Sequence, residues 1–361
     1  MSRLFSYLLV FYSYFLVSNS SNIKENYVAP LFIFGDSLYD AGNNNYLKSA
    51  NNKANFPPYG ETFFKYPTGR FSDGRIIPDF IAGYLNLPLI LPYLQPGHQE
   101  HKYGVNFASG GAGALVQTFQ GSAIDLNTQL NNFKNVKKHL SKKIGDTKTK
   151  ALLSKAIYLF SIGTNDYASP FLSNSTILHH YTNQQYVGIV IGNLTNVVKE
   201  IYKNGGRKFG FMKLLDLSFV PSSRALEQTN RSPMGFKEQA TILVQLHNKA
   251  LPKVFKGLKK ELRGFKYSIF DLYTSASERI NNPSKYGFKE TKTACCGSGP
   301  FRGIGQCGIT KDYELCDNPS EYLFFDGSHP TEKSNKQIAK LMWSGNPKVI
   351  SPYNLKTLLE A

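Results

Sequence analysis

The sequence lacks several features that would assign it to other classes of protein. After its first 20 residues it has no apolar run of membrane-spanning length, and it shows no internal repeat or low-complexity linker. It has no helix-turn-helix, RNA-recognition or zinc-finger pattern, so no nucleic-acid partner is expected despite a formal charge of +17. No glycine-rich segment has the spacing of a dinucleotide-binding fingerprint or a P-loop. What remains is a globular chain of 361 residues, 41% hydrophobic and 19% charged, which we interpret as one domain.

Cysteine is also scarce, and its four positions lie in one glycine-rich region: Cys295, Cys296, Cys307 and Cys316. A zinc site needs paired ligands at regular short spacing, which the vicinal pair fits poorly, so no metal is expected. Two disulfides are favoured in an oxidising compartment. Adjacent cysteines rarely bridge each other, so Cys295 and Cys296 should each pair with one of Cys307 and Cys316.

The N-terminal residues have the pattern of a secretory signal peptide, which we assign to residues 1–20. Arg3 supplies the positive start, Leu8–Val17 is apolar, and small residues follow it. The expected globular domain covers residues 28–350. Because no later segment approaches membrane length, no transmembrane segment is expected.

Two further features fit a secreted, extracellular protein. N-glycosylation sequons begin at Asn174, Asn193 and Asn230. Lysine is scattered along the chain, with a mild cluster between residues 134 and 150. Outside a cell, a basic surface could meet anionic cell-wall polysaccharide or lipid head groups, and the alternative is a charged face that is merely solvated.

Apolar segments of strand length alternate with helical periodicity, which predicts a doubly wound α/β sheet. Strands are expected at residues 31–35, 103–107, 156–162, 208–215, 266–272 and 322–325, and helices at 78–85, 125–143, 187–201, 236–262 and 331–343. Pro252 should kink or divide the helix over 236–262. The segment from Asn43 to Arg75 is dense in Asn, Pro and Gly and predicts a long loop.

The candidate catalytic residues follow expected strands. The first apolar run stops at Gly35, and Asp36 and Ser37 come next, at the sheet edge where α/β proteins bind ligands. A serine hydroxyl needs an adjacent base to act as a nucleophile, and His329 is the candidate. Asp326 lies three residues earlier and could hold the imidazole in the required tautomer.

Ester hydrolysis also needs hydrogen-bond donors for the oxyanion of the tetrahedral intermediate. The candidates are the Ser37 backbone N–H, a backbone N–H in the glycine-rich turn, and the Asn165 side-chain amide. In that turn Gly110, Gly111 and Gly113 are all close, and Gly111 is our choice. Asp166 either braces the neighbouring loop or caps a helix, and the cap is favoured.

Several short motifs together resemble the plant GDSL esterase/lipase family of the SGNH hydrolases. They are Phe-Gly-Asp-Ser-Leu around Ser37, the glycine-rich turn at 106–113, Gly-Thr-Asn-Asp around Asn165, and Asp-Gly-Ser-His-Pro around His329. Further signatures are the segments 40–45, 67–75, 294–297 and 329–332. They occur in family order across nearly the whole expected mature chain.

The resemblance implies a three-layer α/β/α sandwich with a central parallel sheet, flavodoxin-like in arrangement. It also implies a Ser37, Asp326 and His329 triad, with Ser37, a glycine and Asn165 in the oxyanion hole. The expected activity is that of a secreted carboxylic-ester hydrolase acting on lipid or cell-wall esters, with no cofactor. Two alternatives keep the fold: an acyltransferase with the same triad, and a non-enzymatic secreted binding or defence protein.

Overall fold

The computed structural model describes residues 29–361 except 98–100, 174, 231–234, 306 and 310–311. The proposed signal peptide and the Asn174 sequon position therefore lie outside the described residues. No described helix is long and apolar enough to cross a membrane.

A six-stranded sheet forms the centre of the molecule, with strand order β2-β1-β3-β4-β5-β8. The first five strands of this order are parallel to their neighbours, and β8 pairs antiparallel with β5 at one edge. The strands are β1 (Leu31–Gly35), β2 (Gly104–Asn106), β3 (Ile157–Ser161), β4 (Lys208–Met212), β5 (Lys266–Phe270) and β8 (Ile350–Ser351). The order places β1 between β2 and β3, so residues that follow these three strands meet at one edge of the sheet.

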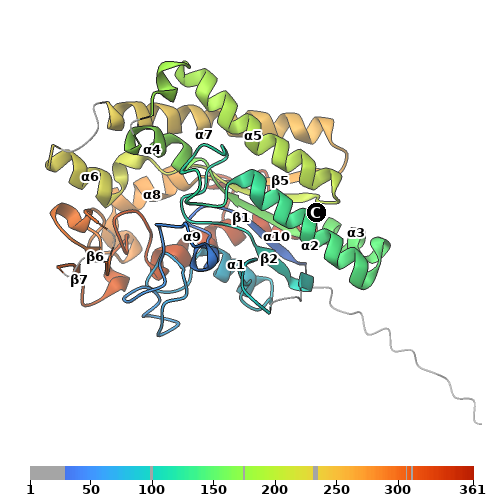
Figure 1. The fold of residues 1–361 in the computed structure, drawn as a ribbon, viewed down its shortest axis with the longest axis horizontal. Coiled ribbons are helices and arrows are strands. Elements are labelled where there is room, and N and C mark those ends of the chain that lie inside the picture. The colour runs from blue at the N-terminus through green and yellow to red at the C-terminus, as the bar shows by residue number, and fades with distance from the viewer. Residues whose placement is uncertain (1–28, 98–100, 174, 231–234, 306, 310–311) are drawn as a thin grey trace, which may run out of the picture.

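Helices cover both faces of the sheet, giving three layers (Figure 1). The helices are α1 (Ile77–Tyr84), α2 (Leu126–Ile144), α3 (Asp146–Lys155), α4 (Thr164–Leu172), α5 (Asn183–Lys203), α6 (Pro221–Gln228), α7 (Phe236–Glu261), α8 (Leu272–Asn281), α9 (Glu332–Ser344) and α10 (Leu355–Glu360). Strand alternation explains the layering: Phe32 and Phe34 pack with α2, α5 and α7, whereas Leu31 and Ile33 pack with α1, α9 and α10. The predicted α/β sandwich is confirmed.

Two expectations about the elements need correction. Pro252 was expected to kink or divide its helix, and the division is absent, because α7 runs from Phe236 to Glu261. Proline removes one helical hydrogen bond, but Leu251 and Phe255 beside it are buried in the core, and this packing holds the helix together. The segment at 322–325 is not a strand of the sheet, because it forms only isolated bridges, Glu290 with Tyr322 and Phe324 with Pro330.

The expected long loop is present, and it contains a single short helical turn, at Asn43–Tyr46. Asp40, just before it, accepts hydrogen bonds from the backbone N–H groups of Gly42, Asn43 and Gly110. The Asn43 amide donates to the carbonyls of Asn106 and Ala108. These bonds fasten the loop to the glycine-rich turn after β2.

Candidate active site

Ser37 lies in the turn that directly follows β1. Gly35, the last residue of that strand, has a φ of +145°, and a Cβ there would lie 2.1 Å from the Ser161 carbonyl oxygen on β3. A side chain at this position would therefore push the two strands apart. The glycine allows the chain to turn sharply at the sheet edge and leaves Ser37 half-buried at the mouth of a cavity.

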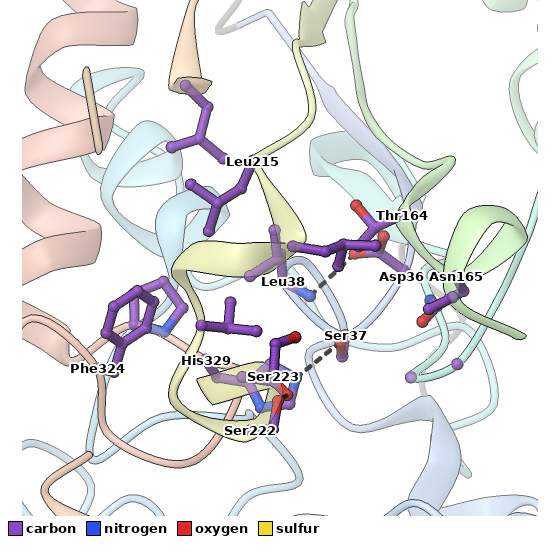
Figure 2. Close-up of a pocket in the computed structure, with 18 of the residues that line it drawn as sticks. Asp36, Ser37, Leu38, Thr164, Asn165, Leu215, Ser222, Ser223, Phe324 and His329 are labelled. Carbon is purple, nitrogen blue, oxygen red and sulfur yellow. Dashed lines mark hydrogen bonds between the residues drawn. The ribbon is translucent and has the colours of Figure 1, made fainter. Parts of the chain in front are cut away.

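The structure brings Ser37, His329 and Asp326 together although 292 residues separate the first two. Ser37 Oγ lies 2.8 Å from His329 Nε2. Figure 2 shows the two side chains pointing toward each other, joined by a dashed line. On the other side of the ring, His329 Nδ1 lies 2.7 Å and 2.8 Å from the two carboxylate oxygens of Asp326. A proton on Nδ1 leaves Nε2 free to accept from the serine hydroxyl.

A tight turn positions Asp326 and His329 relative to each other. The backbone N–H groups of Ser328 and His329 both donate to Asp326 Oδ1, at 2.8 Å each. Desolvation acts to raise the pKa of Asp326, but the charge of His329 and the hydrogen bonds to the carboxylate outweigh it, and the pKa is lowered. Asp326 is therefore a carboxylate at neutral pH.

Two aromatic residues contact the pair: Tyr59, which was not singled out in the sequence, and Phe71, which lies in the 67–75 signature but had no role assigned to it. The Tyr59 hydroxyl donates to Asp326 Oδ2 at 2.7 Å, and both groups are buried. The Phe71 ring lies against the His329 imidazole, with centroids 4.8 Å apart. Both come from the long loop after Ser37, and loop length was the available signal that this segment has a function.

Two ion pairs hold this loop against the helices. Arg70 forms a buried pair with Asp79 of α1, 2.8 Å from Nε to Oδ2. Arg75 Nη2 lies 2.7 Å from Glu332 Oε1 in the first turn of α9, directly after His329. The 67–75 segment thus connects α1 with the start of α9.

The candidate oxyanion donors also gather at this edge. Among the described residues, neither the N–H of Ser37 nor that of Gly111 donates to a protein acceptor, whereas the Gly110 N–H is used by Asp40. Ser37, Gly111 and Asn165 all line the same cavity. The Asn165 amide donates to the Ala112 carbonyl at 2.9 Å, and a primary amide has a second N–H.

The preference for Asp166 as a helix cap was wrong. Asp166 lies inside the first turn of α4, and Gly163 is the N-cap residue. Its carboxyl group accepts from the N–H groups of Ala114 and Leu115 and from the Thr118 hydroxyl. Asp166 therefore braces the loop that carries the glycine-rich turn, because these donors are buried and have no water to bond.

Asp36, next to Ser37, is a buried carboxyl group that accepts few hydrogen bonds to replace those it would make with water. Its Oδ1 accepts from the Leu38 N–H, and its Oδ2 has no partner among the described residues. Burial raises the pKa of Asp36 from 3.8 to about 7. The group is thus protonated in mildly acidic solution, unlike Asp326.

The cavity beside Ser37 has a volume of about 610 Å³. Its wall is largely apolar and comes from several elements, including Leu215, Leu217, Val220, Leu272, Phe324 and Ile338. This size and composition are typical of a site for a small organic molecule. In the part of the chain that the structure describes, no group of three or more His, Cys, Asp or Glu side chains could hold a metal ion.

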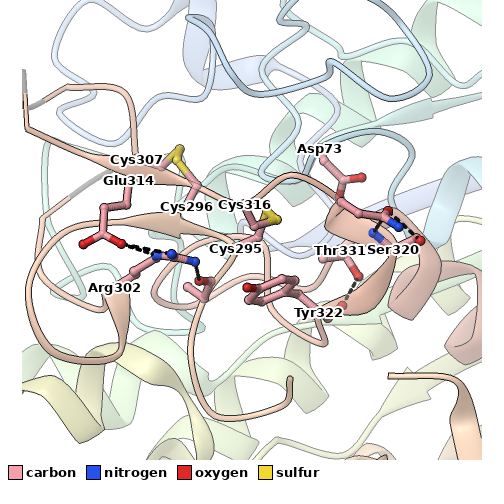
Figure 3. Close-up of a disulfide and its surroundings, with 12 residues drawn as sticks. Asp73, Cys295, Cys296, Arg302, Cys307, Glu314, Cys316, Ser320, Tyr322 and Thr331 are labelled. Atoms are coloured by element: carbon pink, nitrogen blue, oxygen red, sulfur yellow. Dashed lines mark hydrogen bonds and ion pairs between the residues drawn. A yellow bond between two sulfur atoms is a disulfide. The ribbon is translucent and has the colours of Figure 1, made fainter. Parts of the chain in front are cut away.

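The two expected disulfides are present, as Cys295–Cys316 and Cys296–Cys307 (Figure 3). They hold the segment that contains the small sheet of β6 (Cys296–Gly297) and β7 (Glu314–Leu315). The backbone N–H groups of Cys295 and Cys296 donate to the carbonyls of Phe324 and Phe325. This segment therefore supports the chain that leads into Asp326.

The predicted N-glycosylation sites at Asn193 and Asn230 do not line the cavity. Asn193 is on α5, where its amide donates to the Ile189 carbonyl, and Asn230 follows α6. The rest of the sequon at Asn230 lies outside the described residues.

Comparisons with known proteins agree with this geometry. A family model described as GDSL-like lipase/acylhydrolase matches residues 31–342. The chain is 53% identical to GDSL esterase/lipase 1 of Arabidopsis thaliana over 350 residues, covering 95% of this chain and 92% of the relative. It is 50% identical to a GDSL lipase of Tanacetum cinerariifolium, covering 94% and 90% of the two chains. It is also 36% identical to a protein of Arabidopsis thaliana named inactive GDSL esterase/lipase-like protein 25, covering 92% and 75%.

Proposed function

The chain belongs to the GDSL lipase/acylhydrolase family and is a carboxylic-ester hydrolase, and from this premise we propose that Ser37, His329 and Asp326 catalyse the reaction. The observation that carries the proposal is the continuous chain of contacts from Ser37 Oγ through both nitrogens of His329 to Asp326.

In the proposed reaction, Ser37 Oγ attacks the ester carbonyl while its proton passes to His329 Nε2. Asp326 stabilises the imidazolium, which then gives the proton to the leaving alcohol as the C–O bond breaks. A water molecule next attacks the acyl-serine ester and transfers its proton to Nε2. The acid product leaves when His329 returns that proton to Ser37 Oγ, so the enzyme regains its starting state.

The proposed oxyanion hole consists of the N–H groups of Ser37 and Gly111 and the side-chain amide of Asn165. The free N–H groups of Ser37 and Gly111 support this assignment, since unpaired donors beside the nucleophile are available to the developing charge. The earlier choice of Gly111 over Gly110 is supported by the same observation, because Asp40 already accepts from Gly110.

We propose acyl esters of lipids or of cell-wall components as substrates, on the basis of the apolar cavity beside Ser37. Secretion to the apoplast or cell wall, after removal of residues 1–20, is proposed from the signal-peptide pattern, and the two disulfides support it. Use of the sequons at Asn174, Asn193 and Asn230 is part of this proposal. Glycosidase treatment of protein secreted from plant cells should change its gel mobility, and an unchanged mobility would contradict it.

An active-site label tests the assignment of the nucleophile. The purified protein is incubated with a fluorophosphonate, which modifies activated serines, and the modified peptide is identified by mass spectrometry. We expect one adduct, on Ser37, and none in Ser37→Ala or in the His329→Ala variant, which lacks the base. Labelling of another serine, or labelling that persists without His329, would contradict the proposal.

A further inference from the structure

The cavity that begins at Ser37 continues along one face of α8. Leu272, Ser275, Ala276 and Arg279 line it, and their spacing of three or four residues places them on a single side of that helix. Ser334 and Ile338 of α9 line the same region. None of these residues takes part in the proposed reaction at Ser37.

Arg279 is unusual in this wall because it is charged and 4% exposed. Its Nε donates to Gln337 Oε1 at 3.1 Å, and its Nη1 donates to the carbonyl and hydroxyl oxygens of Ser275. The guanidinium carbon lies 4.4 Å from the centroid of the Tyr286 ring. These contacts fix the side chain in place, but Nη2 donates to no described residue.

The positive charge of Arg279 has no ion-pair partner among the described carboxylates. Glu278, the adjacent acidic residue, is exposed and accepts from the Tyr286 hydroxyl instead. Burial lowers the pKa of Arg279, while the charges of Tyr286 and Glu278 oppose this shift. A buried guanidinium without a counter-ion is costly, so a ligand that supplied an anion would be favoured strongly.

Gln337, which holds the guanidinium, lies six residues after Thr331, the N-cap residue of α9, or about 9 Å of helix rise. His329 precedes that cap. Arg279 is therefore held along the body of α9, whereas the reacting groups lie beyond its N-terminal end. Apolar side chains, among them Leu272, Phe324 and Ile338, line the same cavity.

We propose that this cavity binds esters in which a hydrocarbon group ends in a carboxylate, and that Arg279 binds this carboxylate. The N–H groups of Nη2 donate to no described residue, so an oxygen of a carboxylate can accept a charge-assisted hydrogen bond from this fixed cation. The proposal rests on the proposed ester hydrolysis at Ser37 and adds the class of substrate.

The test compares pairs of esters of equal length, with and without a terminal carboxylate. One arm uses 4-nitrophenyl esters of dicarboxylic acids of four to twelve carbons, against the matching simple acyl esters. The other arm uses acetate esters of ω-hydroxy acids, against the matching alkyl acetates, so that the carboxylate is on the alcohol side. The quantity measured is the ratio of kcat/KM within each pair, because general damage to the enzyme cancels in this ratio.

The informative variants are Arg279→Met and Ser275→Asp. Arg279→Met keeps an unbranched stem without the charge. Ser275→Asp places a carboxylate beside the guanidinium, whose Nη1 lies 2.7 Å from Ser275 Oγ, and neutralises it without removing it. The matched control is Arg207→Met, because Arg207 also bonds backbone carbonyls and lies over a tyrosine ring but does not line the cavity.

We expect wild type and Arg207→Met to favour the carboxylate ester in at least one arm. Both informative variants should lower that ratio at least tenfold. If Arg279→Met does not fold, Ser275→Asp still decides the question. Ratios that are equal in wild type and the informative variants, in both arms, would overturn the proposal.

A binding measurement separates this proposal from the catalytic one. Calorimetry follows the binding of suberic acid monomethyl ester to Ser37→Ala, with and without Arg279→Met. A loss of affinity of tenfold or more supports the carboxylate site even if wild type hydrolyses no ester. Equal affinity in the two proteins overturns the carboxylate site and leaves the assignment of Ser37 standing.

Discussion

Three buried carboxyl groups near Ser37 differ in the number of donors that reach them. Asp326 accepts from two backbone N–H groups, from Tyr59 and from His329, and its pKa is lowered. Asp166 accepts from three donors, and burial raises its pKa to about 6, while for Asp36, with one donor, burial raises it to about 7. The negative charge is therefore best stabilised on Asp326, where an imidazolium would need it.

Tyr59 is a positioning residue for this carboxylate. Tyr59→Phe removes the 2.7 Å hydrogen bond to Asp326 Oδ2 and should lower kcat/KM by about 10- to 100-fold, the range for a hydrogen bond to a charged group. The acidic limb of the pH profile should move as well, because the carboxylate loses a donor. The control is Tyr158→Phe, which removes a buried hydroxyl bond to Leu153 away from the site. Equal losses in both variants would mean that Tyr59 acts only through stability.

Asn165 is the side-chain member of the proposed oxyanion hole. Asn165→Ala should lower kcat by two or three orders of magnitude with little change in KM, because this donor acts on the transition state. Thr118→Val is the control, since it loosens the same loop by removing a bond to Asp166 but keeps Asn165. Near-normal turnover in Asn165→Ala would remove this residue from the oxyanion hole.

Asp36 makes stability depend on pH. Its pKa is about 7 in the fold and near 4 in the unfolded chain, so the folded state binds more protons between these values. The free energy of unfolding should therefore fall as the pH rises from about 4 to 7. In Asp36→Asn this fall should be smaller by on the order of 1 kcal/mol per pH unit. Urea denaturation at several pH values measures both curves, and parallel curves would refute the assignment.

At the scale of elements, the sequence predicted β1 to β5 and several helices because their signals are local, but it did not predict β8. Buried strands such as β3 read as apolar runs, and α2 shows an apolar stripe. At Pro252, tertiary packing keeps α7 undivided. Likewise, Asp166 has a local sequence typical of a cap, whereas its actual donors lie about 50 residues earlier in the chain.

Local sequence patterns also fail to show the tertiary contacts of the candidate active site. Ser37, Asp326 and His329 were identifiable because their chemistry and motifs are distinctive. Tyr59 and Arg279 lie outside the motifs, and Phe71 lies in the 67–75 signature, to which no chemistry was assigned. Each makes a contact with a residue more than 50 positions away. Sequence spacing carries no information about such contacts.

The segment held by the two disulfides stabilises the part of the chain that leads into Asp326. Reduction of Cys295–Cys316 and Cys296–Cys307 should lower the free energy of unfolding by about 3 kcal/mol for each bond, given loops of 21 and 11 residues. Activity should fall as well, since this segment bonds the chain before Asp326. Denaturation with and without reductant tests the effect, and four titratable thiols in the native protein would contradict the pairing.

At the scale of the whole molecule, parallel strands bring distant parts of the chain to one edge of the sheet. Ser37 follows β1, Gly111 follows β2 and Asn165 follows β3, while the segment before α9 brings Asp326 and His329 to the same place. The flanking helices and the long loop then enclose an apolar cavity beside the serine. A serine esterase is the function that this arrangement supports best.

The most direct test of this account is hydrolysis of chromogenic esters, from acetyl to long acyl chains, by purified wild type and Ser37→Ala. We predict that the wild type hydrolyses at least part of the series and that Ser37→Ala loses this activity by several orders of magnitude. Product analysis with added alcohols would detect transfer of the acyl group instead of hydrolysis. Equal activity in the two proteins would contradict the role of Ser37, and no activity in wild type on any ester would contradict esterase function.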